Sequence, residues 1–213
     1  MVSEDVVQNS EKESVLIKVP SRPNLPNEVV EFLGGQFKDI NCYLEYGAGG
    51  GARMAARAGV SHIYSVEADE DIVRSVRKAL KQDLKRNSAT VVNANIGETA
   101  KWGFPVGTDS CRLWPNYPIS VWDRMEQADV SPGLVLIDGR FRVACFLITM
   151  LRGLPGTSII FDDFVSREAR YKLVEKYAAP ERVIGRAAVF VVPEERSLVE
   201  LSMDFARACV DPR

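Results

Sequence analysis

Short apolar segments alternate with longer amphipathic segments through most of this 213-residue chain. The short segments are rich in Val, Ile, Leu and Tyr, as buried strands are, and the longer ones carry apolar side chains at helical spacing. We predict strands at 41–45, 61–66, 89–92, 134–137 and 158–161, and helices at 52–58, 69–84, 143–151 and 167–178. Alternating strands and helices favour right-handed βαβ units, so the sequence predicts an α/β fold with a doubly wound, mainly parallel sheet.

The N-terminal part has a different pattern. Residues 1–14 are polar and are expected to be frayed, and three prolines follow before residue 27. Asn27 is expected to cap a short helix that ends at Gly34 and Gly35. We therefore predict an N-terminal tail and segment at 1–26, followed by a single domain at 27–213.

Two further segments interrupt or close the alternation. Gly185 divides the run 182–192 into an expected hairpin, and a last helix is expected at 198–208. Residues 95–120 hold several Gly and Pro residues and are expected to form mostly loop, within an aromatic insert at about 95–122. All three tryptophans, Trp102, Trp114 and Trp122, fall in this insert.

Composition narrows the class of protein. The chain has 27 Lys and Arg and 29 Asp and Glu, with a formal net charge of −2. Proteins that bind bulk nucleic acid usually carry a basic excess, so the composition disfavours that partner, while a local basic patch stays compatible with it. No apolar run has the length of a membrane span, and no partner membrane is expected.

Cysteine usage points to a cytoplasmic protein. Cys42, Cys111, Cys145 and Cys209 are far apart and form no CxxC pair, and the chain has one histidine. A zinc cage is therefore disfavoured, and buried, reduced thiols are expected. The N-terminus lacks the apolar region of a signal peptide.

A glycine-rich turn, Glu45-Tyr-Gly-Ala-Gly-Gly-Gly51, lies between the first predicted strand and helix. Glycine lets the backbone approach a ligand closely, and the helix start offers unpaired N–H groups. The second predicted strand ends at Glu67, whose carboxylate can accept both hydroxyl protons of a ribose and would repel a 2′-phosphate. The structural alternative is a tight turn followed by an unrelated acid.

The turn also fits the GxGxxG/A dinucleotide fingerprint, which makes an NAD-dependent oxidoreductase one alternative. That enzyme class needs a hydride-transfer partner such as a Tyr-x-x-x-Lys pair. Tyr171 is followed directly by Lys172, and Tyr177 is followed four residues later by Glu181, so neither tyrosine forms the pair.

With Glu45 two residues before the first glycine, the motif Glu-x-Gly-x-Gly-x-Gly resembles the first motif of the class I S-adenosylmethionine-dependent methyltransferases. Glu67 ends strand two and Asn95 follows strand three, as similar residues do in that family. The segments 134–139 (LVLIDG) and 154–163 (LPGTSIIFDD) resemble its strand-four and strand-five motifs. The resemblance covers about residues 38–193 and implies a seven-stranded sheet with a C-terminal antiparallel hairpin.

The resemblance also implies roles for individual residues. Glu45 would help to hold the methionine ammonium of S-adenosylmethionine, Glu67 would bind the ribose, and Asp138 would lie near the methyl-donor end. Asn95 and Ile96 would flank the adenine. The backbone of the turn and the residue after the ribose acid complete the implied cofactor set: Gly47, Ala48, Gly49, Gly51 and Ala68.

Carboxylates follow strands four and five. Asp138 and Asp162 are the candidate catalytic bases, with Asp163 beside them. Asp138, Asp162 and Asp163 also resemble the divalent-cation ligands of some O-methyltransferases, but an Asn is usual at position 163, and no metal is the favoured alternative. A helix cap or a solvated turn is the structural interpretation of Asp162 and Asp163.

Candidate substrate residues are Arg140, Trp102 and Trp114. Arg140 and Arg142 follow the fourth strand, and an arginine can bind a carboxylate or phosphate with two N–H groups, or form a local ion pair instead. The tryptophans would form a flexible aromatic lid or pack the insert onto the domain. His62 begins strand two, away from the ligand side, and is not expected to be catalytic.

The sequence therefore predicts a cytoplasmic methyltransferase that uses S-adenosylmethionine to methylate an acceptor, most simply a small molecule. The alternatives are the NAD-dependent oxidoreductase and a catalytically silent binding module with the same fold. The sequence leaves the oligomeric state open, a homodimer included.

Overall fold

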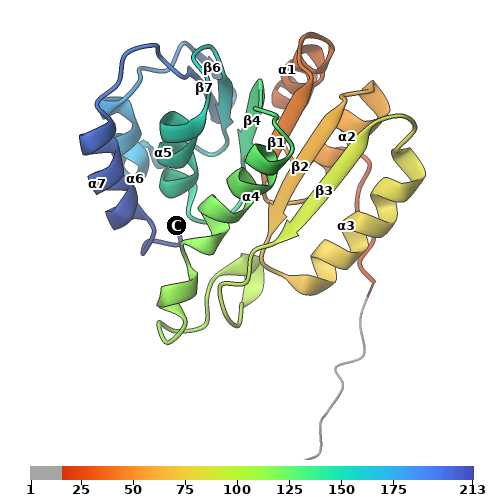
Figure 1. Cartoon of the computed structure of the whole chain (residues 1–213), viewed down its shortest axis with the longest axis horizontal. Coiled ribbons are helices and arrows are strands. Elements are labelled where there is room, and N and C mark those ends of the chain that lie inside the picture. The colour runs from red at the N-terminus through yellow and green to blue at the C-terminus, as the bar shows by residue number, and fades with distance from the viewer. Residues whose placement is uncertain (1–15) are drawn as a thin grey trace, which may run out of the picture.

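Seven strands form one sheet in the order β3-β2-β1-β4-β5-β7-β6 (Figure 1). The computed structural model describes residues 16–213, so the predicted frayed segment at 1–14 lies outside the described residues. The strands are β1 (Cys42–Tyr46), β2 (His62–Glu67), β3 (Ser88–Asn93), β4 (Leu134–Ile137), β5 (Ser158–Phe161), β6 (Arg182–Ile184) and β7 (Ala187–Val191). The five strands β1 to β5 are parallel, and β7 is antiparallel to both β5 and β6. The predicted α/β fold with a C-terminal hairpin is confirmed.

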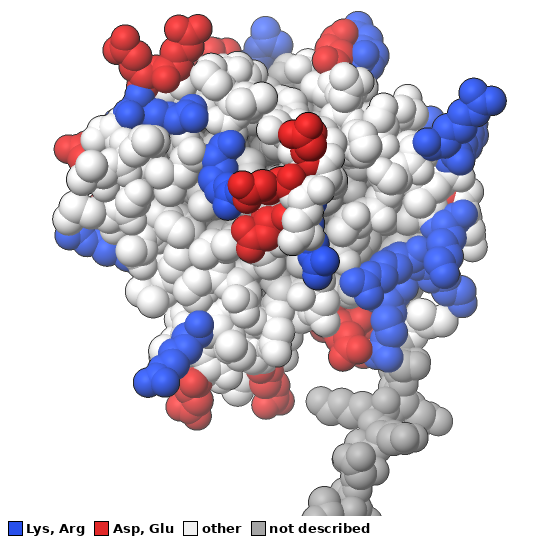
Figure 2. Space-filling view, viewed as in Figure 1, with Lys and Arg blue, Asp and Glu red and all other residues white. Residues whose placement is uncertain are grey.

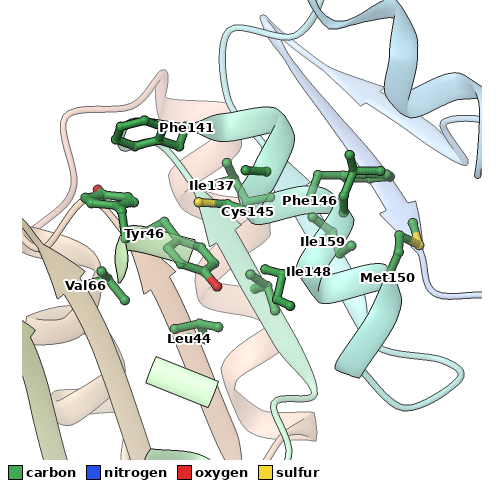
Figure 3. Packing of buried hydrophobic residues seen from close by; sticks show 14 of the residues in the cluster. Leu44, Tyr46, Val66, Ile137, Phe141, Cys145, Phe146, Ile148, Met150 and Ile159 are labelled. Atoms are coloured by element: carbon green, nitrogen blue, oxygen red, sulfur yellow. The ribbon is translucent and has the colours of Figure 1, made fainter. Parts of the chain in front are cut away.

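Helices cover both faces of the sheet (Figure 1). They are α1 (Asn27–Gln36), α2 (Gly50–Ala58), α3 (Glu70–Asp83), α4 (Asn116–Gln127), α5 (Arg142–Arg152), α6 (Glu168–Tyr171) and α7 (Leu198–Ala208). Side chains of α1, α2 and α3 pack on one face, and those of α4, α5 and α7 pack on the other. Figure 3 shows the second of these layers, where Cys145 and Ile148 of α5 face Leu44 and Tyr46 of β1.

Helix α3 follows its sequence pattern closely. The Asp69 side chain accepts hydrogen bonds from the Asp71 and Ile72 amides, as an N-cap residue does. Val73, Val76 and Leu80 are buried against the sheet. The exposed residues of α3 include Arg74, Arg77, Lys78 and Lys81, and Lys and Arg side chains gather over this helix in Figure 2.

The N-terminal segment packs against α2 and alters the start of α1. Arg53 of α2 donates to the Val19 carbonyl at 2.8 Å. A Cβ at Gly50 would collide with the Arg22 backbone, so this contact requires glycine. Asn27 is the first residue of α1 and not its cap, and the helix continues through both predicted glycine stops to Gln36. The division of the chain at residue 26 stays a prediction.

Helix α4 was not predicted from the sequence. Pro115 stands at its N-cap and Pro118 in its first turn, where the missing N–H groups have no helical partner in any case. Its tryptophan, Trp122, is buried and donates from Nε1 to the Tyr46 hydroxyl at 2.8 Å. Tertiary packing thus turns part of the predicted loop into a core helix.

Two other predicted helices differ in detail. The segment 167–178 is broken into α6 and two flanking 3₁₀ turns, Val165–Arg167 and Lys172–Lys176. Tyr171, the last residue of α6, has a buried ring that packs against Phe161 at 4.8 Å between centroids. In α5, Leu147 is fully buried, while Val143 and Leu151 are only partly buried.

Candidate active site

The glycine turn and Glu67 lie side by side at the carboxyl ends of β1 and β2. The Gly47 and Ala48 amides donate to the Val66 carbonyl at 3.0 and 3.1 Å, which fixes the turn against the end of β2. Glu67 Oε1 accepts from the Ala68 amide at 2.7 Å and from the Asp69 amide at 3.2 Å. Burial raises the pKa of Glu67. A ligand held by both groups would therefore span adjacent strands, at the edge where parallel sheets bind ligands.

Glu45 supports the turn from beneath. Its carboxylate is 1% exposed, and Oε1 accepts from the Gly49 amide at 2.9 Å and from the Ser65 hydroxyl at 2.6 Å. Ser65 is the register partner of Glu45 on β2, so the sheet itself places the two side chains together. Tyr43 donates its hydroxyl to Oε2 at 3.2 Å. Burial raises the pKa of Glu45 to about 7, although these hydrogen bonds oppose the shift.

The glycines of the turn have different requirements. Gly47 has φ +97°, and a Cβ there would lie 3.0 Å from the Gly139 amide nitrogen. A Cβ at Gly51 would collide with Glu45 Oε2. Gly49 has an extended backbone with φ −177°, and a Cβ there would meet nothing within 4 Å. The turn is therefore tightly packed at its two ends and open at Gly49.

Tyr117 of α4 reaches the same edge, although it was not among the predicted site residues. Its hydroxyl accepts from the Arg140 amide at 3.4 Å, and a Cβ at Gly139 would collide with it. Burial raises the pKa of Tyr117, and the charge of Glu67 raises it further. The hydroxyl thus lies between the ends of β2 and β4. Pro118 led to the prediction of a loop at this place, so the position of Tyr117 on a helix was not predicted either.

Asn95 and Ile96 follow β3 on the other side of β2. Ile96 is fully buried, whereas Asn95 is exposed. Asn95 Oδ1 accepts from the Gly97 amide at 3.0 Å, and its carbonyl accepts from Asn116 Nδ2 at 3.2 Å. These bonds orient the segment that leaves β3, and the implied contact with adenine stays a prediction.

Arg142 and Arg186 form ion pairs with the carboxylates after β4 and β5. Asp162 is fully buried, and Arg186 donates to its Oδ1 at 2.9 Å and to its Oδ2 at 2.7 Å. Arg142, 3% exposed, donates to Asp138 Oδ1 at 3.2 Å and to Asp163 Oδ2 at 3.3 Å. Asp163 has φ +59° and a mostly buried side chain. Asp162 and Asp163 lie in a turn after β5, as expected, but the turn is not solvated and neither side chain caps a helix, because both carboxylates are buried in an ion-pair network.

The network also bears on the metal candidates. Within residues 16–213, no group of three His, Cys, Asp or Glu side chains is arranged to hold a metal ion. Both oxygens of Asp162 accept from Arg186, so the guanidinium stands where a cation would have to bind. The set Asp138, Asp162 and Asp163 therefore does not fit a divalent cation.

Asp138 is the most accessible acid of this group. Its side chain is 30% exposed, whereas that of Asp163 is 14% exposed. Burial is the largest influence and raises the pKa of Asp138 to about 7, with Arg142 opposing and Asp162 adding to the shift. The segment after Asp138 is anchored by the end of the chain, where the Pro212 carbonyl accepts from the Phe141 amide at 3.2 Å.

The aromatic residues of the insert differ in exposure and packing. Trp114 is 5% exposed and packs against Phe141 at 5.7 Å between centroids, so it is a core residue and not part of a lid. Trp102 is 75% exposed. Phe104 lies under the Arg140 guanidinium, with Cζ 4.3 Å from the ring centroid. The backbone next to Trp102 also approaches Arg140, since a Cβ at Gly103 would lie 3.6 Å from Arg140 Cγ.

His62 lies at the opposite end of the sheet. Its Nδ1 is 3.2 Å from the Ser88 hydroxyl oxygen. A shallow hollow of the surface lies beside it at the amino ends of β1 and β2, lined by Asn41, Cys42, Ser61, His62, Asp129, Val130 and Ser131. Histidine and hollow are therefore both remote from the glycine turn.

A sheet in this strand order, with a glycine turn after β1 and an acid at the end of β2, is the architecture expected of a Rossmann-like methyltransferase. No model of a known family matches the sequence, and no curated protein matches it. Among solved structures, a methyltransferase-like protein from Silicibacter pomeroyi is 33% identical, with 91% of this chain and 100% of that chain covered and a TM-score of 0.80.

The O-methyltransferase from Bacillus cereus in complex with S-adenosylhomocysteine is 18% identical, with 80% of this chain and 85% of that chain covered and a TM-score of 0.50. This second likeness extends to the fold alone. The likeness to the Silicibacter pomeroyi protein shows that the chain belongs to the class I S-adenosylmethionine-dependent methyltransferases.

Proposed function

We propose that this protein transfers the methyl group of S-adenosylmethionine to a small-molecule acceptor. The observation that carries the proposal is the adjacency of the glycine turn and Glu67, joined through the Gly47 and Ala48 hydrogen bonds to Val66. A ligand with a ribose at one end and a charged amino acid at the other fits two such groups on neighbouring strands.

The residues of the turn suit close approach of a ligand. The backbone at Gly49 is open, since a Cβ there would meet nothing within 4 Å. Glu67 faces the turn and has a carboxylate that can accept ribose hydroxyl protons. Glu45 is held by Gly49, Ser65 and Tyr43, so in this proposal it shapes the turn and supplies the negative potential that favours the methionine ammonium. Ala48, Gly51, Ala68, Asn95 and Ile96 complete the proposed cofactor site.

When bound, S-adenosylmethionine supplies an electrophilic methyl on a sulfonium. The protein must place the acceptor atom in line with it, and positioning of this kind supplies several kcal/mol. Asp138 is the proposed base for an acceptor that must lose a proton, because its carboxylate is partly exposed and its pKa is raised to about 7. Asp162 is not proposed for that role, because it is buried and both of its oxygens accept hydrogen bonds from Arg186.

Calorimetric titration with S-adenosylhomocysteine and, separately, with NAD tests the cofactor. We expect S-adenosylhomocysteine to bind with measurable heat, and its affinity to fall at least tenfold in Glu67→Ala. The affinity should be unchanged in Glu168→Ala, because Glu168 is an exposed residue of α6. Binding of NAD without binding of S-adenosylhomocysteine would instead favour an NAD-dependent oxidoreductase. A methyl-labelled donor that binds but never transfers its label to a metabolite extract would leave a silent binding module.

The cellular location is also proposed from the chain itself. All four cysteines are free, and Cys42, Cys145 and Cys209 are buried, which suits a reducing compartment such as the cytoplasm. In the part of the chain that the structure describes, none of the helices combines the length and hydropathy that crossing a bilayer requires.

A further inference from the structure

Arg140 is a half-buried cation without a carboxylate. It follows Gly139 on the segment between β4 and α5. Within residues 16–213 its guanidinium takes part in no hydrogen bond or ion pair, and its one close partner is the Phe104 ring at 4.3 Å. Unpaired cations at partly buried positions are uncommon, because desolvation is costly without a compensating anion.

The neighbouring arginines are all paired. Arg142 contacts two of the three carboxylates after β4 and β5, Arg186 contacts Asp162 and Asp163, and Arg167 lies 3.1 Å from Asp163 Oδ2. Three guanidinium groups therefore pair with three carboxylates, and Arg140 pairs with none of them. Its pKa is lowered, first by burial and then by the like charges of Arg142 and Arg167.

An aromatic turn covers this cation. The Ala100 amide donates to the Phe104 carbonyl at 2.7 Å and closes the turn Lys101–Gly103. With Phe104 stacked on one face of the guanidinium, the N–H groups at its edge stay free for a ligand. Trp102, at the tip, is 75% exposed and has φ +66°, a strained conformation for a bulky residue. Such strain is retained mainly where function requires it.

We propose that Arg140, Phe104 and Trp102 form the acceptor subsite and bind an oxyanion, a carboxylate or a phosphate, carried by a flat small molecule. The proposal rests on the proposed methyl transfer and specifies its acceptor class. The oxyanion would take two N–H groups of Arg140 and neutralise its unpaired charge, and the flat body would stack on Trp102. A single half-buried arginine suits one anionic group, whereas a nucleic acid needs a row of exposed cations.

Direct binding tests the subsite without turnover. The full chain, saturated with S-adenosylhomocysteine, is titrated with 4-hydroxybenzoate, with phenyl phosphate and with neutral 4-hydroxybenzamide. We expect at least one of the two acids to bind and the amide to bind at least tenfold more weakly. The two acids distinguish a carboxylate site from a phosphate site. Equal binding of the amide, or no binding of either acid, would overturn the proposal.

Two variants assign the effect to Arg140. Arg140→Met should weaken the acid by about tenfold or more, and Arg140→Lys should be intermediate, since it keeps the charge and loses the fork. The matched control is Arg182→Met, because Arg182 also lies over a phenyl ring, that of Phe32, at 5.6 Å, on the far strand β6. Acid binding that survives in Arg140→Met, or is lost equally in Arg182→Met, would contradict the assignment.

A labelling experiment separates this proposal from the general one. Extract incubated with a methyl-labelled donor is divided into an RNA fraction and a small-molecule fraction, and the latter is applied to an anion exchanger. Label in a retained small molecule, lost in Arg140→Met, is expected. Label in RNA or in an unretained product would overturn the acceptor class and leave methyl transfer standing. If the protein does not bind S-adenosylhomocysteine, the proposed methyl transfer is wrong. A titration with the two acids in the absence of S-adenosylhomocysteine would still test the anion subsite.

Discussion

The Gly49 amide donates a hydrogen bond of 2.9 Å to Glu45 Oε1, so the most open residue of the glycine turn is held by a buried acid. The carboxylate is 1% exposed and has no cation beside it among its hydrogen-bond partners Gly49, Ser65 and Tyr43. The turn therefore depends on a group whose charge is costly to bury.

This dependence predicts a pH effect on stability. Burial raises the pKa of Glu45 from 4.5 to about 7, so the folded state binds the proton more tightly than the unfolded state. The resulting stabilisation is complete below about pH 4.5 and is lost as the pH rises to about 7, up to about 3 kcal/mol. Glu45→Gln keeps an acceptor for Gly49 and should remove this contribution.

Urea unfolding of the unchanged protein and of Glu45→Gln between pH 5 and pH 8 tests this pH dependence of stability. The difference in unfolding free energy between Glu45→Gln and the unchanged protein should shift in favour of the variant as the pH rises. A difference that stays constant across this range would show that Glu45 titrates as an ordinary carboxylate.

Substitutions in the glycine turn should separate folding from binding. Gly47→Ala places a Cβ at φ +97° and 3.0 Å from the Gly139 nitrogen, and should destabilise the protein by about 1–3 kcal/mol. Gly49→Ala has an extended backbone and open space, so thermal unfolding should change little. Its affinity for S-adenosylhomocysteine should nevertheless fall, because the methyl group enters the space proposed for the ligand. Unchanged affinity in Gly49→Ala would place the ligand elsewhere.

The ion-pair network should be sensitive at Arg142. Arg142→Met leaves Asp138 and Asp163 without their shared guanidinium in a buried environment, which should cost about 3–5 kcal/mol of unfolding free energy. Arg152→Met removes exposed pairs with Asp123 and Glu126 and should cost less than about 1 kcal/mol. Chemical denaturation of the two variants measures the contrast, and similar costs would contradict the importance of the buried network.

The proposed base predicts the pH dependence of turnover. Since burial raises the pKa of Asp138 to about 7, the methyl-transfer rate at saturating donor should rise as the pH increases through that value. Asp138→Asn should lower the rate and abolish this rise. A profile that is the same in the variant would show that another group, or solvent, accepts the proton.

Metal removal should have no effect. Arg186 occupies both oxygens of Asp162, so a chelator should leave the methyl-transfer rate unchanged, and added Mg²⁺ should not raise it. Rates measured after dialysis against EDTA and after addition of Mg²⁺ decide the point. A loss that Mg²⁺ restores would mean that the arginine gives way to a cation.

Much of the sheet follows from local patterns, since buried parallel strands such as 134–137 are continuous apolar runs between turn residues. The final helix, Leu198–Ala208, was also predicted with its bounds. Helix α4 was not, because Pro118 is a breaker in most of a helix but harmless in a first turn. Only the surrounding core shows that this proline stands in a first turn.

The candidate site shows the same division. Motif spacing points to Glu45 and Glu67, which stand at strand ends. Arg142 stands four residues after Asp138, and their pair is the local ion pair that the sequence analysis gave as an alternative. The pairs of Arg142 with Asp163 and of Arg186 with Asp162 join segments that are distant in the sequence. Ion pairs between distant segments depend on the tertiary fold, so the sequence did not predict the network.

The unequal exposure of the tryptophans also has a practical consequence. Trp102 is 75% exposed, whereas Trp114 and Trp122 are 5% and 3% exposed. One indole therefore emits from a watery environment and two from dry ones. Quenching by iodide, an anion that cannot penetrate the interior, should address the first alone, so one unlabelled sample can report docking at the tip and melting of the interior as separate fluorescence signals.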